Sequence, residues 1–250
     1  MTSRMAFVAA VVAAHLSVQL VTAQSVVVVN GASFRPEVSA GSWATAGGSF
    51  GTVANTTATA FPIPTTLNGV TVIVDGVAAP VYFVSGTQIN FLVPYATQPG
   101  IRPVQVKTAA STLSGSVKVL SAAPGVFTQD TAIPPKGAIR NQDSSLNTSS
   151  SPAKRGEVIQ IFGTGPGAVS TTPGDGAAVG SSPLVSSKST PQVFIGGIEA
   201  TVQFSGLTPG QTGLWQVNAF VPNQGFLTGR VPVQVFIDGV DSNEVTVFVQ

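Results

Sequence analysis

The chain has 250 residues, with eleven Lys or Arg and ten Asp or Glu, and charged residues make up only 8% of it, against about 25% in a typical domain. Such a chain offers no basic patch for nucleic acid and little electrostatic attraction to anionic membranes. It has no Cys, and its one His is His15, so a Cys or Ser–His nucleophile is excluded from the chain beyond that point, and zinc or copper sites are disfavoured there.

Residues 1–23 have the pattern of a secretory signal peptide, with cleavage predicted between Ala23 and Gln24. Arg4 is followed by a mainly apolar run to about Leu20, and small residues precede the cleavage point. A membrane anchor is the alternative, but polar residues interrupt the roughly 20 apolar residues that a span needs. We therefore expect a secreted or envelope-associated protein whose mature chain has zero net charge and no membrane span.

Residues 24–122 predict a first β-sandwich. Residues 25–34, "SVVVVNGASF", indicate an N-terminal strand, and apolar residues alternate with others in 70–74 and 88–93, which places one row on a core. Asp75-Gly76 lies between two such runs and favours a tight hairpin. Residues 41–52, "GSWATAGGSFGT", lack a strongly apolar strand, so we expect the sandwich to be frayed or rearranged there.

Residues 123–152 are rich in Ser, Pro and other polar residues. This composition predicts a connector, stiff at Pro134-Pro135 and loose at the "SSSP" of 149–152. Residues 153–250 then predict a second β-sandwich.

The second sandwich repeats the first. "QINFLVP" at 88–94 returns as "QVNAFVP" at 216–222, "PVQV" at 103–106 returns at 232–235, and the second copy carries an insertion at 207–213. The pattern is typical of a tandem duplication. The predicted fold class is all-β, with two tandem immunoglobulin-like β-sandwich domains after a cleaved signal peptide.

Six motifs together resemble a family of exported bacterial proteins, a C-terminal domain family abundant in soil Acidobacteria of the Solibacter type. They are "GSWATAGG" (41–48), "GTQINFLVP" (86–94), "APGVFTQD" (123–130), "NQDSSLN" (141–147), "PAKRGEVIQIFGTGPG" (152–167) and "GLTPGQTGLWQVNAFVP" (206–222). The resemblance covers nearly the whole chain beyond the signal. It implies immunoglobulin-type or transcription-factor-immunoglobulin-type (TIG-like) sandwiches without an assigned activity.

The candidate ligand-binding residues are Trp215, Tyr95, Gln216 and Asn218. Trp215 precedes the repeated motif and follows the insertion, and it is one of four large rings with a polar edge, together with Trp43, Tyr82 and Tyr95. A sugar could lie on such a ring, but sandwiches commonly bury them. Gln216 and Asn218 fall on the outward row of a strand, where a purely structural role is the alternative.

No catalytic, metal or cofactor residues are assigned, and no cofactor is expected. Calcium needs only oxygen ligands, so a calcium site stays an open alternative at two turns: Asp238, Asp241 and Glu244 stand with Asn243 at one, and 141–147 contains Asn141, Asp143 and Asn147. Neither turn matches the twelve-residue calcium loop, and such residues are ordinary in turns. The acids are scattered over turns, which does not suggest the paired carboxylates of glycoside hydrolysis.

The sequence thus favours a secreted, non-catalytic protein, not an enzyme, with a structural, adhesive or protein-interaction role at the cell exterior. Its expected partners are other exported proteins, cell-wall or extracellular polysaccharide, or a second copy of itself, and not nucleic acid. The alternative is a carbohydrate-binding module that acts on extracellular polysaccharide.

Overall fold

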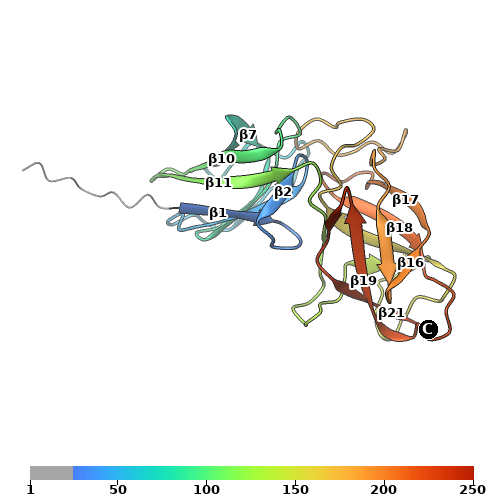
Figure 1. Ribbon diagram of the computed structural model, residues 1–250. Coiled ribbons are helices and arrows are strands. Elements are labelled where there is room, and N and C mark those ends of the chain that lie inside the picture. Colours follow the sequence, from blue (N-terminus) through green and yellow to red (C-terminus); the bar gives the residue numbers. More distant parts are fainter. Residues whose placement is uncertain (1–24) are drawn as a thin grey trace, which may run out of the picture.

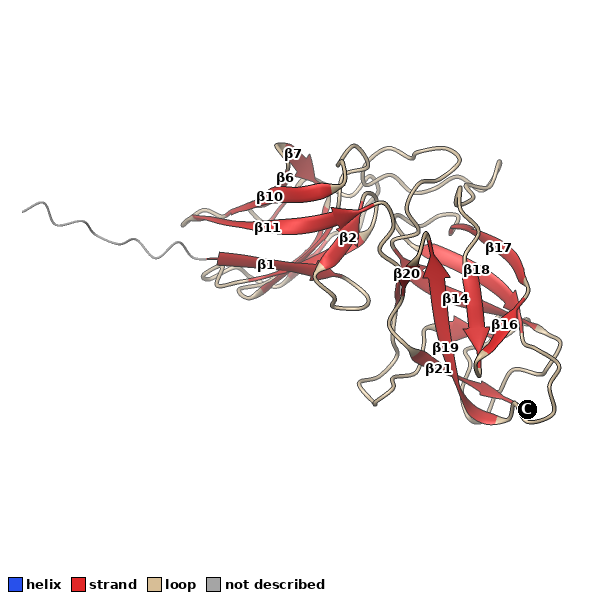
Figure 2. Cartoon of the chain, viewed as in Figure 1, coloured by secondary structure: helices blue, strands red, loops and turns tan. Residues whose placement is uncertain are grey.

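The computed structural model describes residues 25–250, so the predicted signal peptide and its cleavage between Ala23 and Gln24 lie outside the described residues. Within this range the chain consists of strands and loops and contains no helix, which confirms the predicted all-β class. Figures 1 and 2 show two β-units in tandem. No helix that could cross a bilayer is present in the described range.

The first unit is one continuous sheet that folds over on itself. It contains β1 (Ser25–Asn30), β2 (Glu37–Ser39), β3 (Trp43–Gly47), β4 (Thr56–Thr57), β5 (Thr66–Leu67), β6 (Val70–Val74), β7 (Val77–Ala79), β8 (Val81–Val84), β9 (Gln88–Leu92), β10 (Gly100–Lys107) and β11 (Thr112–Leu120). The order is β4-β8-β9-β3-β1-β11-β10-β6-β5, with β2 on β11 and β7 on β6. β1 joins the two layers because it pairs antiparallel with β3 and parallel with β11.

The alternation seen in the sequence decides which side chains face the core. Val70, Val72 and Val74 in β6 are buried, while the intervening residues are half-buried. They meet residues of the opposite layer, such as Phe91, in one apolar cluster. The β6–β7 hairpin turns at Asp75-Gly76, both at positive φ (50° and 83°), as the sequence predicts.

Residues 41–52 correct one expectation, because they contain an ordered central strand. β3 is hydrogen-bonded to β1 on one side and to β9 on the other. Ala44 and Ala46 point inward and are fully buried, and Phe50 just beyond the strand is buried in the same cluster. Small side chains suffice here because large neighbours fill the core, so weak hydrophobicity did not prevent strand formation.

The second unit is a sandwich of two sheets that share one core. One sheet holds β12 (Gly125–Val126), β13 (Ile139–Arg140), β14 (Val158–Thr164), β17 (Val202–Leu207) and β18 (Trp215–Phe220). The other holds β15 (Gln192–Ile195), β16 (Ile198–Ala200), β19 (Gly229–Ile237), β20 (Val240–Asp241) and β21 (Val245–Val249). This two-layer, mainly antiparallel build is that of an immunoglobulin-like sandwich.

The segment 123–152 is predicted to be a connector, but in the structure it forms part of the second unit. β12 and β13 both pair with β14, and Val126 and Ile139 are fully buried in the core. Asn147 binds both backbone groups of Phe248 in β21, at 2.7 and 2.9 Å. The two strands are only two residues long, so the polar composition around them conceals them.

The two units share one strand plan. The hairpins β6–β7 and β8–β9 of the first correspond to β15–β16 and β17–β18 of the second, and β10–β11 corresponds to β19–β21. Even a β-bulge recurs, at Val81/Phe83 and at Val202/Phe204. That the copies arose by duplication stays a prediction.

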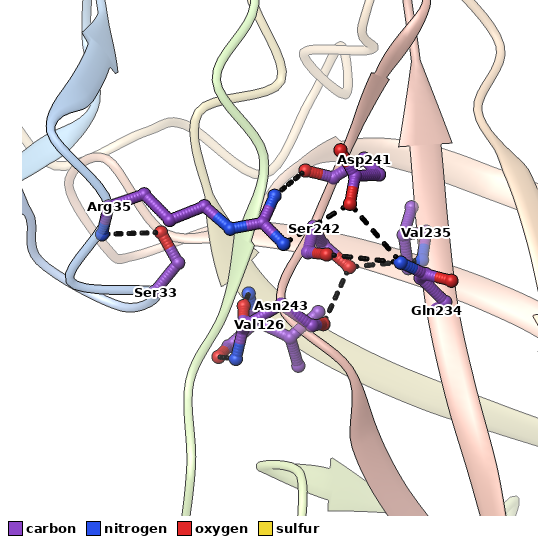
Figure 3. A network of polar contacts seen from close by, with 8 residues as sticks. All are labelled: Ser33, Arg35, Val126, Gln234, Val235, Asp241, Ser242 and Asn243. Carbon is purple, nitrogen blue, oxygen red and sulfur yellow. Dashed lines mark hydrogen bonds and ion pairs between the residues drawn. The ribbon is translucent and has the colours of Figure 1, made fainter.

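Polar contacts join the units on two sides. Figure 3 shows one of them, in which the Arg35 guanidinium donates to the Asp241 carbonyl (2.6 Å) and carboxylate (3.1 Å). Next to it, the Asn243 side chain pairs with both backbone groups of Val126, so β12 is held at the same place. On the other side, the Ile63 N–H donates to the carbonyl of Gly176, in the long loop after β14 that reaches the first unit (Figure 1).

Candidate functional site

A cleft of about 310 Å³ lies between the two units. This volume is at the lower end of the range for small-molecule sites. The first unit contributes Gly31, Trp43, Ala44, Thr45, Phe61, Ile63, Tyr82 and Asn90, and the second contributes Phe127, Gln211, Thr212 and Leu214. Most of these side chains are apolar or aromatic, and none is charged.

An aromatic pair forms the wall on the first unit. Trp43 is the first residue of β3, opposite Leu92 of β9, and Tyr82 occupies the bulge in β8. The bulge turns the Tyr82 ring outward, where it is 41% exposed. The two rings meet edge to face, with centroids 5.5 Å apart and an interplanar angle of 64°, a favourable arrangement for aromatic pairs.

The insertion of the second unit, 207–213, forms the facing wall. The Trp43 indole N–H donates to the Thr212 carbonyl at 2.9 Å, and the Trp43 backbone N–H donates to Thr164 Oγ1 at 2.8 Å. Gly213 lies at positive φ (59°) against Leu92, where an added Cβ would overlap the Leu92 side chain. Only glycine therefore allows the insertion to approach the first unit this closely.

Amide groups line the remaining part of the cleft. Asn90 Oδ1 accepts hydrogen bonds from Thr45 Oγ1 (3.1 Å) and Gln88 Nε2 (2.9 Å). Asn90 is therefore held in one orientation, and its Nδ2 group makes no hydrogen bond to the described residues. Gln211, on the opposite wall, is exposed. The cleft can thus offer rings for packing and amides for hydrogen bonding.

Trp215, the leading candidate from the sequence, does not offer a surface for a ligand. It points inward from β18 and is only 1% exposed, within the core of the second unit. Its indole N–H donates to Ser205 Oγ at 2.9 Å, which satisfies the buried donor. The physical reason is alternation, because Gln216 and Asn218 take the outward positions of this strand.

Tyr95 is held between the units rather than presented to solvent. Its ring lies against Gly41, its backbone N–H donates to Asp175 Oδ1 at 2.9 Å, and it packs on a small apolar cluster that includes Val179 and Leu207. Burial, with the nearby Asp175 carboxylate adding to it, raises the pKa of the Tyr95 phenol well above its usual value. Tyr95 therefore serves the contact between the units.

Gln216 and Asn218 lie on the outward row of β18, as the sequence predicts, but away from the cleft. Gln216 Nε2 donates to Asn218 Oδ1 at 2.8 Å, and the same bond joins Gln88 and Asn90 in the first unit at 2.9 Å. None of the four predicted residues lines the cleft. Trp43 and Tyr82, which do line it, were visible in the sequence as rings with a polar edge, but nothing there placed them together.

The acidic turns do not converge on a metal site. Asp241 is paired with Arg35, and Asp143 accepts two hydrogen bonds from Ser145, which lower the pKa of that carboxyl group. Asn141 and Asn147 bind each other in a buried network. Within residues 25–250, no three His, Cys, Asp or Glu side chains gather as metal ligands would.

Comparisons with known proteins give only distant structural likeness. No family model and no curated protein sequence matches the chain. The chain is similar to SGBP-B of the Bacteroides ovatus mixed-linkage glucan utilization locus, in complex with a mixed-linkage heptasaccharide, at 13% identity and a TM-score of 0.36, over 86% of this chain and 43% of that one. SGBP-B from a Bacteroides uniformis xyloglucan utilization locus matches at 10% identity and a TM-score of 0.29, over 88% and 47%.

The titin tandem of immunoglobulin domains A164-A165 matches at 11% identity and a TM-score of 0.23, over 86% of this chain and 91% of that one. The chain spans less than half of the length of the two Bacteroides proteins. With TM-scores this low, the three likenesses say nothing about ligand or activity. The resemblance to the Solibacter-type exported family stays a prediction.

Proposed function

We propose that this protein is an exported, non-catalytic tandem β-sandwich protein that binds an extracellular polysaccharide in the cleft between its units. The observation that carries the proposal is the Trp43–Tyr82 pair beside the fixed amide of Asn90. A sugar ring has an apolar face of C–H groups that packs on aromatic rings, and a rim of hydroxyls that hydrogen-bond to amides. Apolar walls with a few oriented polar groups are the usual build of a ligand site.

The lining of the cleft also supports a binding role without catalysis. Glycoside hydrolysis uses two carboxyl groups about 5–10 Å apart, one of which protonates the leaving oxygen. The residues that line the cleft include neither Asp nor Glu, and no Lys or Arg. A sugar bound here would meet no general acid or base.

The same cleft accounts for the structural or adhesive role that the sequence favours. A protein that binds wall or matrix polysaccharide and leaves it intact is retained on that polymer. We therefore place its action at the cell exterior, attached to polysaccharide rather than to a protein partner.

The test uses the chain from residue 24 onward, a glycan array, and titration calorimetry on each glycan that binds. Tyr82→Ala removes an exposed ring of the cleft, and we expect it to weaken binding about tenfold or more, because central aromatic contacts commonly contribute over about 1.4 kcal/mol. Phe226→Ala is the control, since Phe226 is an even more exposed ring (69%, against 41% for Tyr82) that does not line the cleft. An array without binders, or a Tyr82→Ala protein that binds as the parent does, would contradict the proposal.

A further inference from the structure

We infer that the cleft takes an uncharged glycan and discriminates against polysaccharides that carry carboxylate, sulfate or phosphate groups. This inference rests on the proposed function and goes further, because it names the class of glycan. It depends on the charge of the cleft walls, on the position of the cations, and on the hydrogen-bonding groups that the walls present.

The walls of the cleft contain no group that could neutralise an anion. All the lining side chains are apolar, aromatic, amide or hydroxyl groups. Proteins that bind acidic sugars or phosphates use Arg or Lys, and Arg in particular pairs with both oxygens of a carboxylate. A carboxylate placed in this cleft would lose its hydration without gaining an ion pair, which is unfavourable.

None of the Lys and Arg side chains in the described range lines the cleft. Five form ion pairs with acids: Arg35, Arg102, Lys118, Lys136 and Lys154. An anionic glycan would therefore find no cation along its walls.

The hydrogen-bonding groups suit hydroxyls. The oxygen of the Asn90 amide is already used twice, so this residue offers its Nδ2 donor. Gln211, across the cleft, can offer both a donor and an acceptor. A sugar hydroxyl donates and accepts at once and matches both residues, whereas a carboxylate only accepts.

The test compares glycans that share one backbone and differ in charge. The first pair is a soluble β-glucan and its carboxymethyl derivative; the second is fully methyl-esterified polygalacturonate and the free acid. Binding is followed by calorimetry and by the fluorescence of Trp43, which lines the cleft, whereas Trp215 is buried. Each titration is repeated at about 0.05 M and 0.5 M salt, because screening changes only charge-dependent binding.

We expect at least one neutral polymer to bind with a Kd that changes less than about twofold between the two salt concentrations, and its charged counterpart to bind at least about tenfold more weakly. Gln211→Arg places a cation on the exposed rim and should improve binding of the charged polymer severalfold, in a salt-sensitive way. Gln211→Met, which removes the amide without adding charge, should not.

The outcomes separate the two proposals. A charged polymer that binds as tightly as its neutral counterpart, and loses affinity in Tyr82→Ala, would overturn the inference and leave the proposed function standing. If none of the four polymers, and no glycan on the array, binds in a way that depends on Tyr82, the proposed function itself fails.

Discussion

The strands β3, β8 and β9 of the first unit pair in the same register as β14, β17 and β18 of the second. Trp43 pairs with Leu92 as Val158 pairs with Phe220, and the bulge residue Tyr82 corresponds to Gln203. The amide pairs of β9 and β18 are the same in both. The backbone and the amides are thus repeated, while the Trp43 and Tyr82 rings of the first unit are replaced by Val158 and Gln203 in the second.

The second difference lies in what covers each face. The insertion 207–213 of the second unit lies against the first, where Trp43 binds Thr212 and Gln211 completes the cleft. The cleft therefore requires both units: the first supplies Trp43 and Tyr82, and the second supplies the facing wall.

The largest effect is expected from Gly213→Ala, which should push the insertion 207–213 away from the first unit. The new methyl group would overlap Leu92 and strain a residue at positive φ. We expect a loss of about 2–4 kcal/mol in the free energy of unfolding, measured by urea denaturation, and at least about tenfold weaker glycan binding.

Gly210→Ala is the control in the same insertion. Gly210 also has positive φ (74°), but no heavy atom lies within 4 Å of the added position. It should cost only about 1 kcal/mol, because the backbone strain remains and the overlap is absent. Equal losses for both variants would show that the close approach to Leu92 is unimportant.

An intermediate effect is expected from Tyr95→Phe at alkaline pH. Tyr95 follows the repeated motif in the first unit and is covered by the second, whereas its counterpart Asn223 is exposed. The pKa of Tyr95 is raised in the folded state, so its contribution to stability is complete below the unfolded pKa near 10 and is lost as pH rises through the folded pKa.

The parent protein should therefore lose up to about 1.4 kcal/mol from this group for each pH unit above about 10, and Tyr95→Phe should not. At pH 7 the two should differ by less than about 0.5 kcal/mol, since the Tyr95 hydroxyl makes no hydrogen bond to the described residues. Urea denaturation at pH 7 and pH 11 measures both. Parallel losses in the two proteins would argue against a buried phenol.

The smallest effect is expected from Gln203→Tyr, which gives the second face the ring of the first. The position is an exposed bulge, so the change should be tolerated. Because the insertion 207–213 faces the first unit rather than this position, we expect glycan affinity to change less than about twofold, and Tyr82→Ala/Gln203→Tyr to remain as weak as Tyr82→Ala. Recovery of binding in the double variant would mean that the ring suffices without the opposing wall.

The sequence predicted the fold where the signal is local. The alternation of Val70, Val72 and Val74 and the turn at Asp75-Gly76 depend on neighbouring residues and on backbone φ, and both are found as expected. The strand at 43–47 was missed because its inward residues are alanines. β12 and β13 were missed because two-residue strands have no detectable period.

The cleft could not be predicted, because it depends on contacts between distant parts of the chain. Trp43 and Thr212 are 169 residues apart in sequence, and only the docking of the two units brings them together. The prediction that Trp215 binds a ligand was based on its place beside an insertion, where a ring could be accessible. Trp215 instead occupies an inward position of β18, so its ring lies in the core. The predicted amides, Gln216 and Asn218, belong to the second unit, which has Val158 and Gln203 at the positions of Trp43 and Tyr82.

Because β12 and β13 of the segment 123–152 pair with β14, fragments of this protein must include that segment to form a complete second unit. A fragment expressed from residue 153 would lack Val126 and Ile139, and so would expose the edge of β14 and part of its core. Ile133, in the loop between β12 and β13, is 98% exposed, and such exposed loops are preferred sites of proteolytic cleavage. A single cut there would leave β12 on the N-terminal piece but still bound in the C-terminal sandwich, so the two pieces would migrate together until denatured.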